Sequence, residues 1–271
     1  MRKVLYTITI IVLLVVFAFS AFQVVNYVVE SKRQAEKFDA LAQIKQEAMQ
    51  NAATEPAKPE QPEETTGQAE DATEPTGETE ETEPQMLPQY AALYEMNSDL
   101  VGWIEIPGTK VNYPVVQTTP DNRDYYLYKN FEKQKASGGC LYVREECDVF
   151  KPSDNVTIYG HNMNNGTMFA DIHKYTDQAY YESHPVIQIL TPNGDFELEF
   201  FSGYVTGLDA NAWQLTFESD DEYEDWLETA MEKSAFESEV IPTVEDRVVT
   251  LSTCSNSAME TRFVLLGVIR E

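Results

Sequence analysis

Residues 87–271 of the sequence predict a mainly β domain, closed as a barrel or packed as a sandwich, with a few inserted helices. The first observation is a series of short runs rich in Val, Ile, Tyr and Phe, each bounded by turn residues. The second is that helical spacing is rare in this part of the chain. The third is length, because about 185 residues are enough for one domain with a sizeable core.

The chain begins with a basic start at residues 1–3 and an apolar run at residues 4–29, which together predict a transmembrane signal-anchor helix. About 20 residues of helix rise about 30 Å, which is enough to cross the apolar layer of a bilayer. The alternative is a cleaved signal peptide, since Ala18-Phe19-Ser20 resembles a cleavage site. The apolar run is longer than a typical signal core, so an uncleaved anchor is favoured. Basic residues flank the run on both sides, so charge gives weak help with its orientation.

Two polar segments follow the anchor and are predicted to hold the domain away from a membrane. Residues 30–53 have the pattern of a juxtamembrane helical stalk. Phe38, Leu41 and Ile44 form a thin apolar stripe on it, which suits a stalk or a weak partner contact. Residues 54–86 are rich in Glu and Pro and contain almost no large apolar side chains. Such a segment cannot offset the entropy cost of ordering, so it is predicted to be an acidic, disordered linker.

The elements of the domain are predicted in chain order as follows. A short helix around Tyr90, Leu93 and Tyr94 precedes a strand that ends at a Pro-Gly turn. Seven further strands are predicted at residues 111–117, 138–144, 155–161, 185–191, 196–205, 247–254 and 262–270. Helices are predicted at residues 166–177 and 219–236, and the second begins with a Ser-Asp-Asp-Glu cluster that suits a helix cap.

The composition argues against several classes of function. The net charge of −27 would repel a phosphate backbone, so nucleic acid is not an expected partner. The three cysteines, Cys140, Cys147 and Cys254, form neither a disulfide framework nor a metal-site spacing. Cys140 and Cys147 can pair if the chain between them turns back, although buried free thiols are the simpler interpretation.

The strongest chemical signal is a cysteine at the end of one predicted strand and an arginine at the start of the next. Cys254 ends its strand, and Arg262 follows a short polar loop. If the two strands pair, the guanidinium favours a thiolate and can donate hydrogen bonds to an oxyanion or a carbonyl. A buried structural cysteine beside a surface arginine is the alternative that these residues alone leave open.

A nucleophilic thiol also needs a base, and the chain has three histidines. His161 follows a predicted strand and therefore stands at a strand end, which makes it the acid–base candidate. His173 lies in a predicted helix and His184 precedes a proline, and a packing role is favoured for both. A Cys–His pair with a nearby arginine indicates acyl transfer through a thioester. The sequence contains no phosphate-binding loop or metal-protease motif that competes with this hypothesis.

At these motifs the chain resembles the class B sortases, which are membrane-anchored cysteine transpeptidases of Gram-positive cell surfaces. The resemblance rests on TLSTC at 250–254, on Arg262 after it, and on YGHNMNNGTMFADIHKY at 159–175 before it. It extends over nearly all of residues 88–271, including NSDLVGWIEIPGTKVNYPVVQ, DNRDYYLYKNF, HPVI and FFSGY. It implies that residues 87–271 are a sortase catalytic domain, a closed β-barrel with an N-terminal helix and inserted helices.

The resemblance also implies a role for each matching residue. Cys254 matches the nucleophile, which attacks the threonine carbonyl of a sorting motif of the LPxTG or NPQTN kind. His161 matches the acid–base residue, which protonates the leaving amine and later deprotonates the incoming one. Arg262 matches the arginine that holds the substrate and stabilises the oxyanion.

Four further residues are candidates for substrate binding. Ser252 and Thr253 lie inside the signature, and Trp213 and Leu215 lie in the segment 207–217 that corresponds to a groove-lining loop. Ser255 is a departure, because some class B members have an acidic residue after the cysteine. That difference leaves the substrate preference open.

The partners implied by the resemblance are secreted surface proteins with a C-terminal sorting motif and an amine. The amine belongs to a lipid-linked peptidoglycan precursor or to a pilin lysine. The implied location is the cell membrane, crossed once, with residues 1–3 in the cytoplasm and the catalytic domain outside. We expect no cofactor and no metal site. The alternatives are a membrane-tethered cysteine peptidase and a non-catalytic peptide-binding module, although binding alone does not require the set of Cys254, His161 and Arg262.

Overall fold

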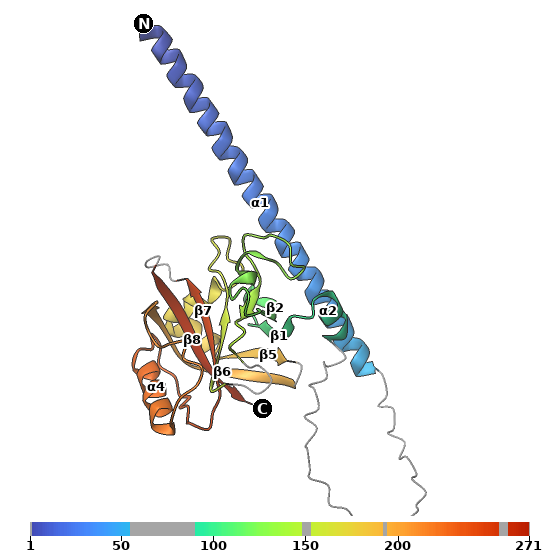
Figure 1. Ribbon diagram of the computed structural model, residues 1–271, viewed down its shortest axis with the longest axis vertical. Coiled ribbons are helices and arrows are strands. Elements are labelled where there is room, and N and C mark those ends of the chain that lie inside the picture. The colour runs from blue at the N-terminus through green and yellow to red at the C-terminus, as the bar shows by residue number, and fades with distance from the viewer. Residues whose placement is uncertain (1, 55–89, 148–152, 192–193, 255–259, 271) are drawn as a thin grey trace, which may run out of the picture.

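The structure is a computed structural model that describes residues 2–54, 90–147, 153–191, 194–254 and 260–270 (Figure 1). The helices are α1 (Arg2–Thr54), α2 (Ala91–Met96), α3 (Gln178–Ser183) and α4 (Asp220–Glu232), with short 3-10 helices η2 (Tyr125–Tyr128) and η3 (Asp171–Thr176). The strands are β1 (Leu100–Glu105), β2 (Asn112–Gln117), β3 (Leu141–Val143), β4 (Asn155–Tyr159), β5 (Val186–Thr191), β6 (Gly194–Gly207), β7 (Val248–Cys254) and β8 (Thr261–Arg270).

The eight strands close into a barrel in the order β1-β2-β3-β4-β7-β8-β6-β5, with β5 returning to β1. The choice that the sequence left open between a barrel and a sandwich is therefore decided in favour of the barrel. Most neighbouring strands are antiparallel, but β2–β3 and β4–β7 are parallel. The parallel pairing of β4 with β7 matters for function, because it brings the ends of two distant strands to the same rim.

Alternation along the strands separates two cores. On β7, Val249 and Leu251 point into the barrel and belong to its main hydrophobic cluster. Val248, on the opposite face, belongs to a second cluster that forms beneath α4 with Trp226 and Leu227. The outer face of β7 is thus covered by α4 at its beginning and is left for the functional site at its end.

Helix α4 begins where the sequence predicts a cap. The Ser219 hydroxyl accepts a hydrogen bond from the Glu222 backbone N–H, and acidic residues occupy the first turn. The prediction of a helix over 166–177 is only partly right. The structure has a 3-10 helix beginning at Asp171, and a turn with positive φ at Gly166 and Met168 precedes it.

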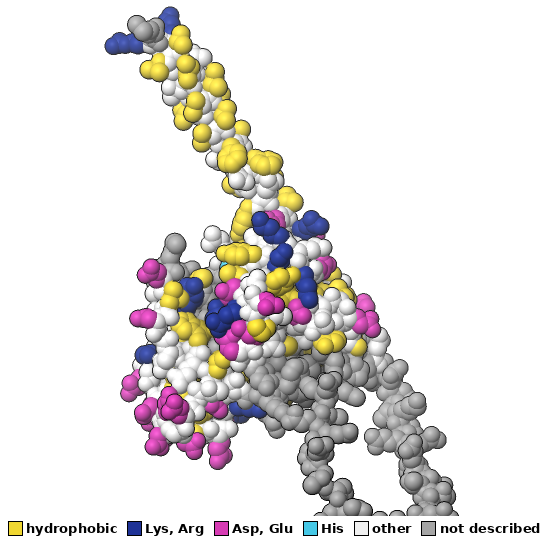
Figure 2. Space-filling model, viewed as in Figure 1, with side chains coloured by type: hydrophobic (Ala, Val, Ile, Leu, Met, Phe, Trp, Pro, Cys, Tyr) yellow, Lys and Arg dark blue, Asp and Glu magenta, His cyan; other side chains and the backbone are white. Residues whose placement is uncertain are grey.

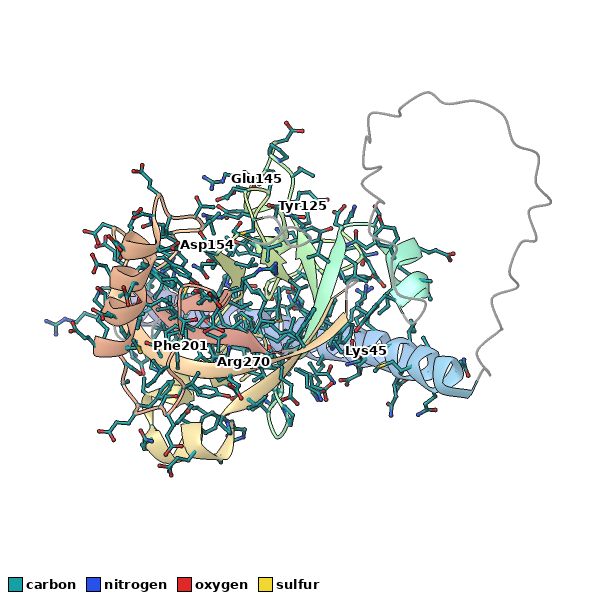
Figure 3. The ribbon with its side chains drawn as sticks, turned by 90° about the horizontal axis from the view of Figure 1, so that it is seen from below. Lys45, Tyr125, Glu145, Asp154, Phe201 and Arg270 are labelled. Atoms are coloured by element: carbon teal, nitrogen blue, oxygen red, sulfur yellow. The ribbon has the colours of Figure 1, made fainter. Side chains whose placement is uncertain are left out.

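Helix α1 is continuous from its exposed apolar half into a half that packs on the barrel (Figure 1). Phe38 and Leu41 are buried, and the Phe38 ring meets the Tyr113 ring edge-on with centroids 4.9 Å apart. Lys45 forms an ion pair with Glu105 at 3.0 Å, and Figure 3 shows it where α1 passes along the barrel. The apolar stripe of the expected stalk therefore contacts the barrel itself.

The exposed half of α1 is long and apolar enough to cross a membrane by length and composition. The acidic linker expected at residues 54–86 lies outside the described residues except for its first position. Cys140 and Cys147 are both buried free thiols, as the simpler interpretation of their spacing predicted.

The rim of the barrel at the beginning of β7 is held by an ionic contact. Asp246 pairs with Arg270 of β8 and accepts a hydrogen bond from the Thr243 N–H at 2.8 Å. Burial raises the pKa of the Asp246 carboxyl, but these hydrogen bonds outweigh burial and hold its pKa below the ordinary value. The charged form of Asp246 is therefore favoured in the folded protein.

Candidate active site

Cys254 and Arg262 face each other across the end of the β7–β8 pair. Cys254 is the last residue of β7, and its cross-strand partner in the antiparallel register is Arg262, the second residue of β8. The Cys254 side chain is exposed, and Arg262 is half-buried with its Nη1 donating to the Thr261 carbonyl at 3.0 Å. The expectation that pairing of these strands brings the thiol and the guanidinium together is confirmed.

His161 reaches the same rim from β4. In the parallel β4–β7 pair, Tyr159 lies opposite Ser252. His161 and Cys254 each follow two residues later, so both lie at the same level, and adjacent strands are about 4.8 Å apart. His161, which is distant in the sequence, thus reaches the same rim as Cys254 and Arg262 at the ends of the consecutive strands β7 and β8.

Gly160 allows the end of β4 to lie close to the buried side chains of Leu141 and Phe169. A Cβ atom at residue 160 would lie 2.4 Å from Leu141 Cδ2 and 2.6 Å from Phe169 Cδ2, which is closer than real Cβ contacts. The Gly160 N–H donates to the Ser252 carbonyl at 3.1 Å, and the Thr253 hydroxyl donates to the Gly160 carbonyl at 2.8 Å. These bonds join the two strand ends directly beneath His161 and Cys254.

The His161 ring has one nitrogen committed to the backbone. Its Nε2 lies 2.8 Å from the Leu127 carbonyl oxygen. Because a carbonyl oxygen only accepts hydrogen bonds, this contact assigns the proton of the neutral ring to Nε2. Nδ1 is then the nitrogen that can take up and return a proton. The Tyr128 ring, 5.5 Å from the imidazole centroid, covers one side of it.

The three strand ends open into a cavity of about 430 Å³. The cavity is bounded on one side by η2 and on the other by the segment that follows β6. Its lining residues are Asp124, Leu127, Tyr128, Tyr142, Arg144, Tyr159, Gly160, His161, Leu208, Trp213, Ser252, Thr253, Cys254 and Arg262. Ligand pockets have volumes of about 300–1,000 Å³, and this cavity falls within that range.

The predicted substrate-binding residues fall into two groups. Ser252, Thr253 and Trp213 line the cavity, and the Trp213 indole N–H donates to the Ser252 hydroxyl at 3.0 Å. Leu215 does not line the cavity. It packs against the barrel core, and its carbonyl accepts the Asn155 N–H at 3.1 Å. Ser255 lies outside the described residues.

A polar part of the cavity lining was not predicted. Arg144 forms an ion pair with Asp124 at 3.0 Å and lies over the Tyr159 ring, 4.6 Å from its centroid. The Tyr142 hydroxyl also donates to Asp124, at 3.1 Å. Burial raises the pKa of Tyr159 to about 12, so this phenol is neutral at physiological pH. The sequence offers one signal for this polar part of the lining. Arg144 stands two residues after Tyr142, and alternate residues along an extended chain lie on the same face.

The other two histidines lie away from the cavity. The His184 ring stacks on Tyr180, with centroids 4.3 Å apart, and the His173 ring packs near Phe263. The packing roles favoured for them agree with these positions. Within the described part of the chain, no group of three or more His, Cys, Asp or Glu side chains could hold a metal ion.

Comparisons with known proteins agree with this geometry. The sortase domain family matches residues 104–269. Sortase B of Staphylococcus aureus is 36% identical over 174 residues, which cover 64% of this chain and 70% of that protein. Sortase B of Listeria monocytogenes is 36% identical over 162 residues, which cover 60% of this chain and 65% of that protein. The Staphylococcus aureus sortase B–substrate complex superposes with a TM-score of 0.74 at 28% identity, covering 90% of this chain and 99% of that one.

Proposed function

The chain belongs to the class B sortases, which are cysteine transpeptidases, and we propose that Cys254 forms a thioester with the threonine of a sorting motif on a secreted surface protein. The motif is of the LPxTG or NPQTN kind, and the acyl group passes from the thioester to an amine. The single observation that carries this proposal is the register of β7 with β8, which pairs Cys254 with Arg262 at one cavity that His161 also lines.

In the first step, the Cys254 thiolate attacks the threonine carbonyl carbon and a tetrahedral oxyanion forms. The Arg262 guanidinium lies directly across from the thiol and stabilises this oxyanion by charge and hydrogen bonding. The C–N bond then breaks, and the leaving amine takes a proton from the His161 imidazolium. The products of this half-reaction are a thioester and a free amine.

In the second step, an acceptor amine attacks the thioester carbonyl and gives its proton to His161. The C–S bond breaks, a new amide forms and Cys254 returns as the thiolate. One amide is exchanged for another without oxidation or reduction, so the reaction needs no redox cofactor.

The walls of the cavity suggest how the peptide lies. Trp213 and Leu208 form an apolar side next to Ser252, and we assign them to the side chains of the sorting motif. The Thr253 hydroxyl is already bonded to Gly160, so its role is to hold the strand ends together. Leu215 supports this side from the barrel core rather than touching the substrate.

The acceptor amine belongs to a lipid-linked peptidoglycan precursor or to a pilin lysine. The exposed apolar half of α1 supports a membrane anchor. In our proposal this helix crosses the membrane once, with residues 1–3 inside and the barrel outside, where secreted substrates are found.

The test uses the full chain in detergent micelles, because α1 contributes Phe38 to the barrel's core and its removal would expose Tyr113. The chain is mixed with LPxTG-type and NPQTN-type peptides, with and without an amine, and followed by mass spectrometry. We expect an adduct on Cys254 that an amine converts to a new amide. Conversion to free acid only, even with excess amine, would identify a peptidase instead.

Cys254→Ala separates catalysis from binding. This variant should form no adduct and no product, while binding the preferred peptide as tightly as the unchanged chain. Peptide binding by the unchanged chain without any adduct would identify a non-catalytic binding module.

A further inference from the structure

The loops around the active-site cavity meet α1 at the end of its apolar run. The Ser137 N–H donates to the Glu30 carboxylate at 3.0 Å, and the Asn165 amide donates to the Ser31 hydroxyl. Asn165 is in the loop that follows His161. The apolar run ends at residue 29, so Ser31 lies about 3 Å further along the helix axis. The headgroup layer is about 5–8 Å thick on each side of a bilayer. The loop after His161 is therefore at headgroup level when α1 spans the membrane.

Basic residues lie on α1 and on the loops beside it at this level. We call them the basic collar; its members are Lys32, Arg33, Lys110, Lys129 and Lys135. Lys135 and Arg33 line one surface hollow together with Glu30. The backbones of Lys129 and Lys135 form an isolated antiparallel β-bridge. The Lys110 ammonium donates to the Asn165 carbonyl at 3.0 Å. Five residues from three separate parts of the chain thus converge where α1 leaves its apolar run.

The basic collar contrasts with the rest of the protein. The chain carries a net charge of −27, yet no ion pair joins any member of the collar to a carboxylate of the described residues. Figure 2 shows dark blue side chains gathered where the helix meets the body, with a few magenta ones among them, and many magenta side chains at the lower left, over α4. The nearby Glu132 is paired with Lys37, and Glu30 is bonded to the Ser137 N–H. Within the described residues the collar members therefore have no ion-pair partner, although the Glu30 carboxylate keeps its negative charge among them, on the side from which the apolar helix emerges.

We propose that the basic collar binds anionic phospholipid headgroups and so holds the mouth of the cavity against the membrane surface. Lys129 directly follows Tyr128, which lines the cavity. Two segments connect the cavity to the collar. Segment 127–129 contains the lining residue Tyr128 and the collar residue Lys129, and segment 161–165 begins at the lining residue His161 and ends at Asn165, which Lys110 contacts. Because screening at physiological salt acts over about 8 Å, only charges this close to the headgroups contribute. Each such Lys or Arg strengthens binding roughly fivefold.

This inference rests on the proposed insertion of α1, so the experiment measures insertion separately. The full chain is placed in nanodiscs of phosphatidylcholine alone or with phosphatidylglycerol, and amide hydrogen exchange is followed. Protection of residues 4–29 in both lipids reports insertion. Slower exchange of residues 127–137 and 161–167 in the phosphatidylglycerol discs, by about tenfold, reports binding by the collar.

The variant Lys129→Gln/Lys135→Gln should weaken the lipid contact roughly 25-fold and restore fast exchange. Lys129→Arg/Lys135→Arg should keep the protection, which shows that charge rather than a folding defect is responsible. The matched control is Lys233→Gln/Arg247→Gln, since both residues are exposed, with Lys233 directly after α4 and Arg247 at the beginning of β7, the end opposite Cys254. It should change nothing.

Three results would overturn the proposal. One is equal exchange of residues 127–137 in the two lipids while residues 4–29 are protected. Another is loss of protection in the control pair. The third is equal protection produced by inorganic phosphate in phosphatidylcholine discs, because it would mean that the collar recognises free phosphate rather than a lipid surface.

Discussion

Replacing Gly160 by alanine should lower the catalytic rate even under conditions where the protein remains fully folded. The added Cβ would lie 2.4 Å from Leu141 Cδ2 and 2.6 Å from Phe169 Cδ2. Carbon atoms in contact are about 3.5–4.0 Å apart, so one partner or the strand end must move by about 1 Å. Leu141 and Phe169 are fully buried and have no room to swing aside. Part of the displacement therefore falls on the strand end that carries His161.

Two magnitudes follow from this clash. Overpacking of this kind typically lowers the free energy of unfolding by about 1–3 kcal/mol. A misplacement of about 1 Å at a catalytic group lowers the rate by about 100-fold. We therefore expect kcat/KM for transpeptidation to fall about 100-fold under conditions where the variant is still fully folded.

The assay compares kcat/KM and the Tm of the full chain in micelles for Gly160→Ala and for Gly207→Ala. Gly207 ends β6 beside the cavity residue Leu208, and its added Cβ meets only the flexible end of Asp209, at 2.8 Å. Gly207→Ala should keep kcat/KM within about threefold. If Gly160→Ala also keeps its kcat/KM within threefold, the packing of β4 against Leu141 and Phe169 does not position His161.

Three further predictions concern other parts of the molecule. Arg262→Lys keeps the charge but loses the guanidinium fork, so kcat should fall about 100-fold or more while peptide affinity changes little; single-turnover kinetics and peptide titration separate the two. Phe38→Ala should lower the free energy of unfolding by about 3–5 kcal/mol in urea titrations, because it removes the ring that packs against Tyr113 and leaves a cavity between α1 and the barrel. Asp246→Asn should lower it by about 1 kcal/mol at pH 7, since Arg270 is partly solvated. The native pKa of Asp246 is depressed, so its stabilisation is present above the ordinary carboxyl pKa of about 3.9 and disappears as the pH falls through the native value. The difference in stability between the two proteins should therefore begin to shrink below about pH 4, and a constant difference down to pH 3 would contradict this account.

The sequence predicts the strands and the paired rim well because both depend on local patterns. Alternation of Val249 and Leu251 with polar residues marks β7, and a short loop between two strands makes Cys254 and Arg262 neighbours. Contacts between distant segments have no such signal. The apolar stripe that begins at Phe38 is too short to predict that α1 packs on the barrel. The ion pair between Arg144 and Asp124 joins segments that are 20 residues apart, and no local pattern predicts it.

The assignment of Leu215 beside Trp213 shows the same limit at finer scale. Both are apolar and lie two residues apart, so the sequence treats them alike. The segment that contains them is not a strand, so their separation by two residues does not place them on one face. The Trp213 indole turns to the Ser252 hydroxyl, whereas Leu215 turns to the core. Only the path of the backbone between β6 and α4 distinguishes them.

The position of β8 has a consequence for how the protein matures. All other strands of the barrel precede β8 in the chain, yet β8 lies between β7 and β6 and is hydrogen-bonded to both. A chain that is synthesised from its N-terminus contains His161 and Cys254 before it contains β8. Until β8 slides into the gap, the barrel is open and the guanidinium of Arg262 is missing from the rim. Synthesis itself therefore keeps the thiol without its partner until the last strand arrives.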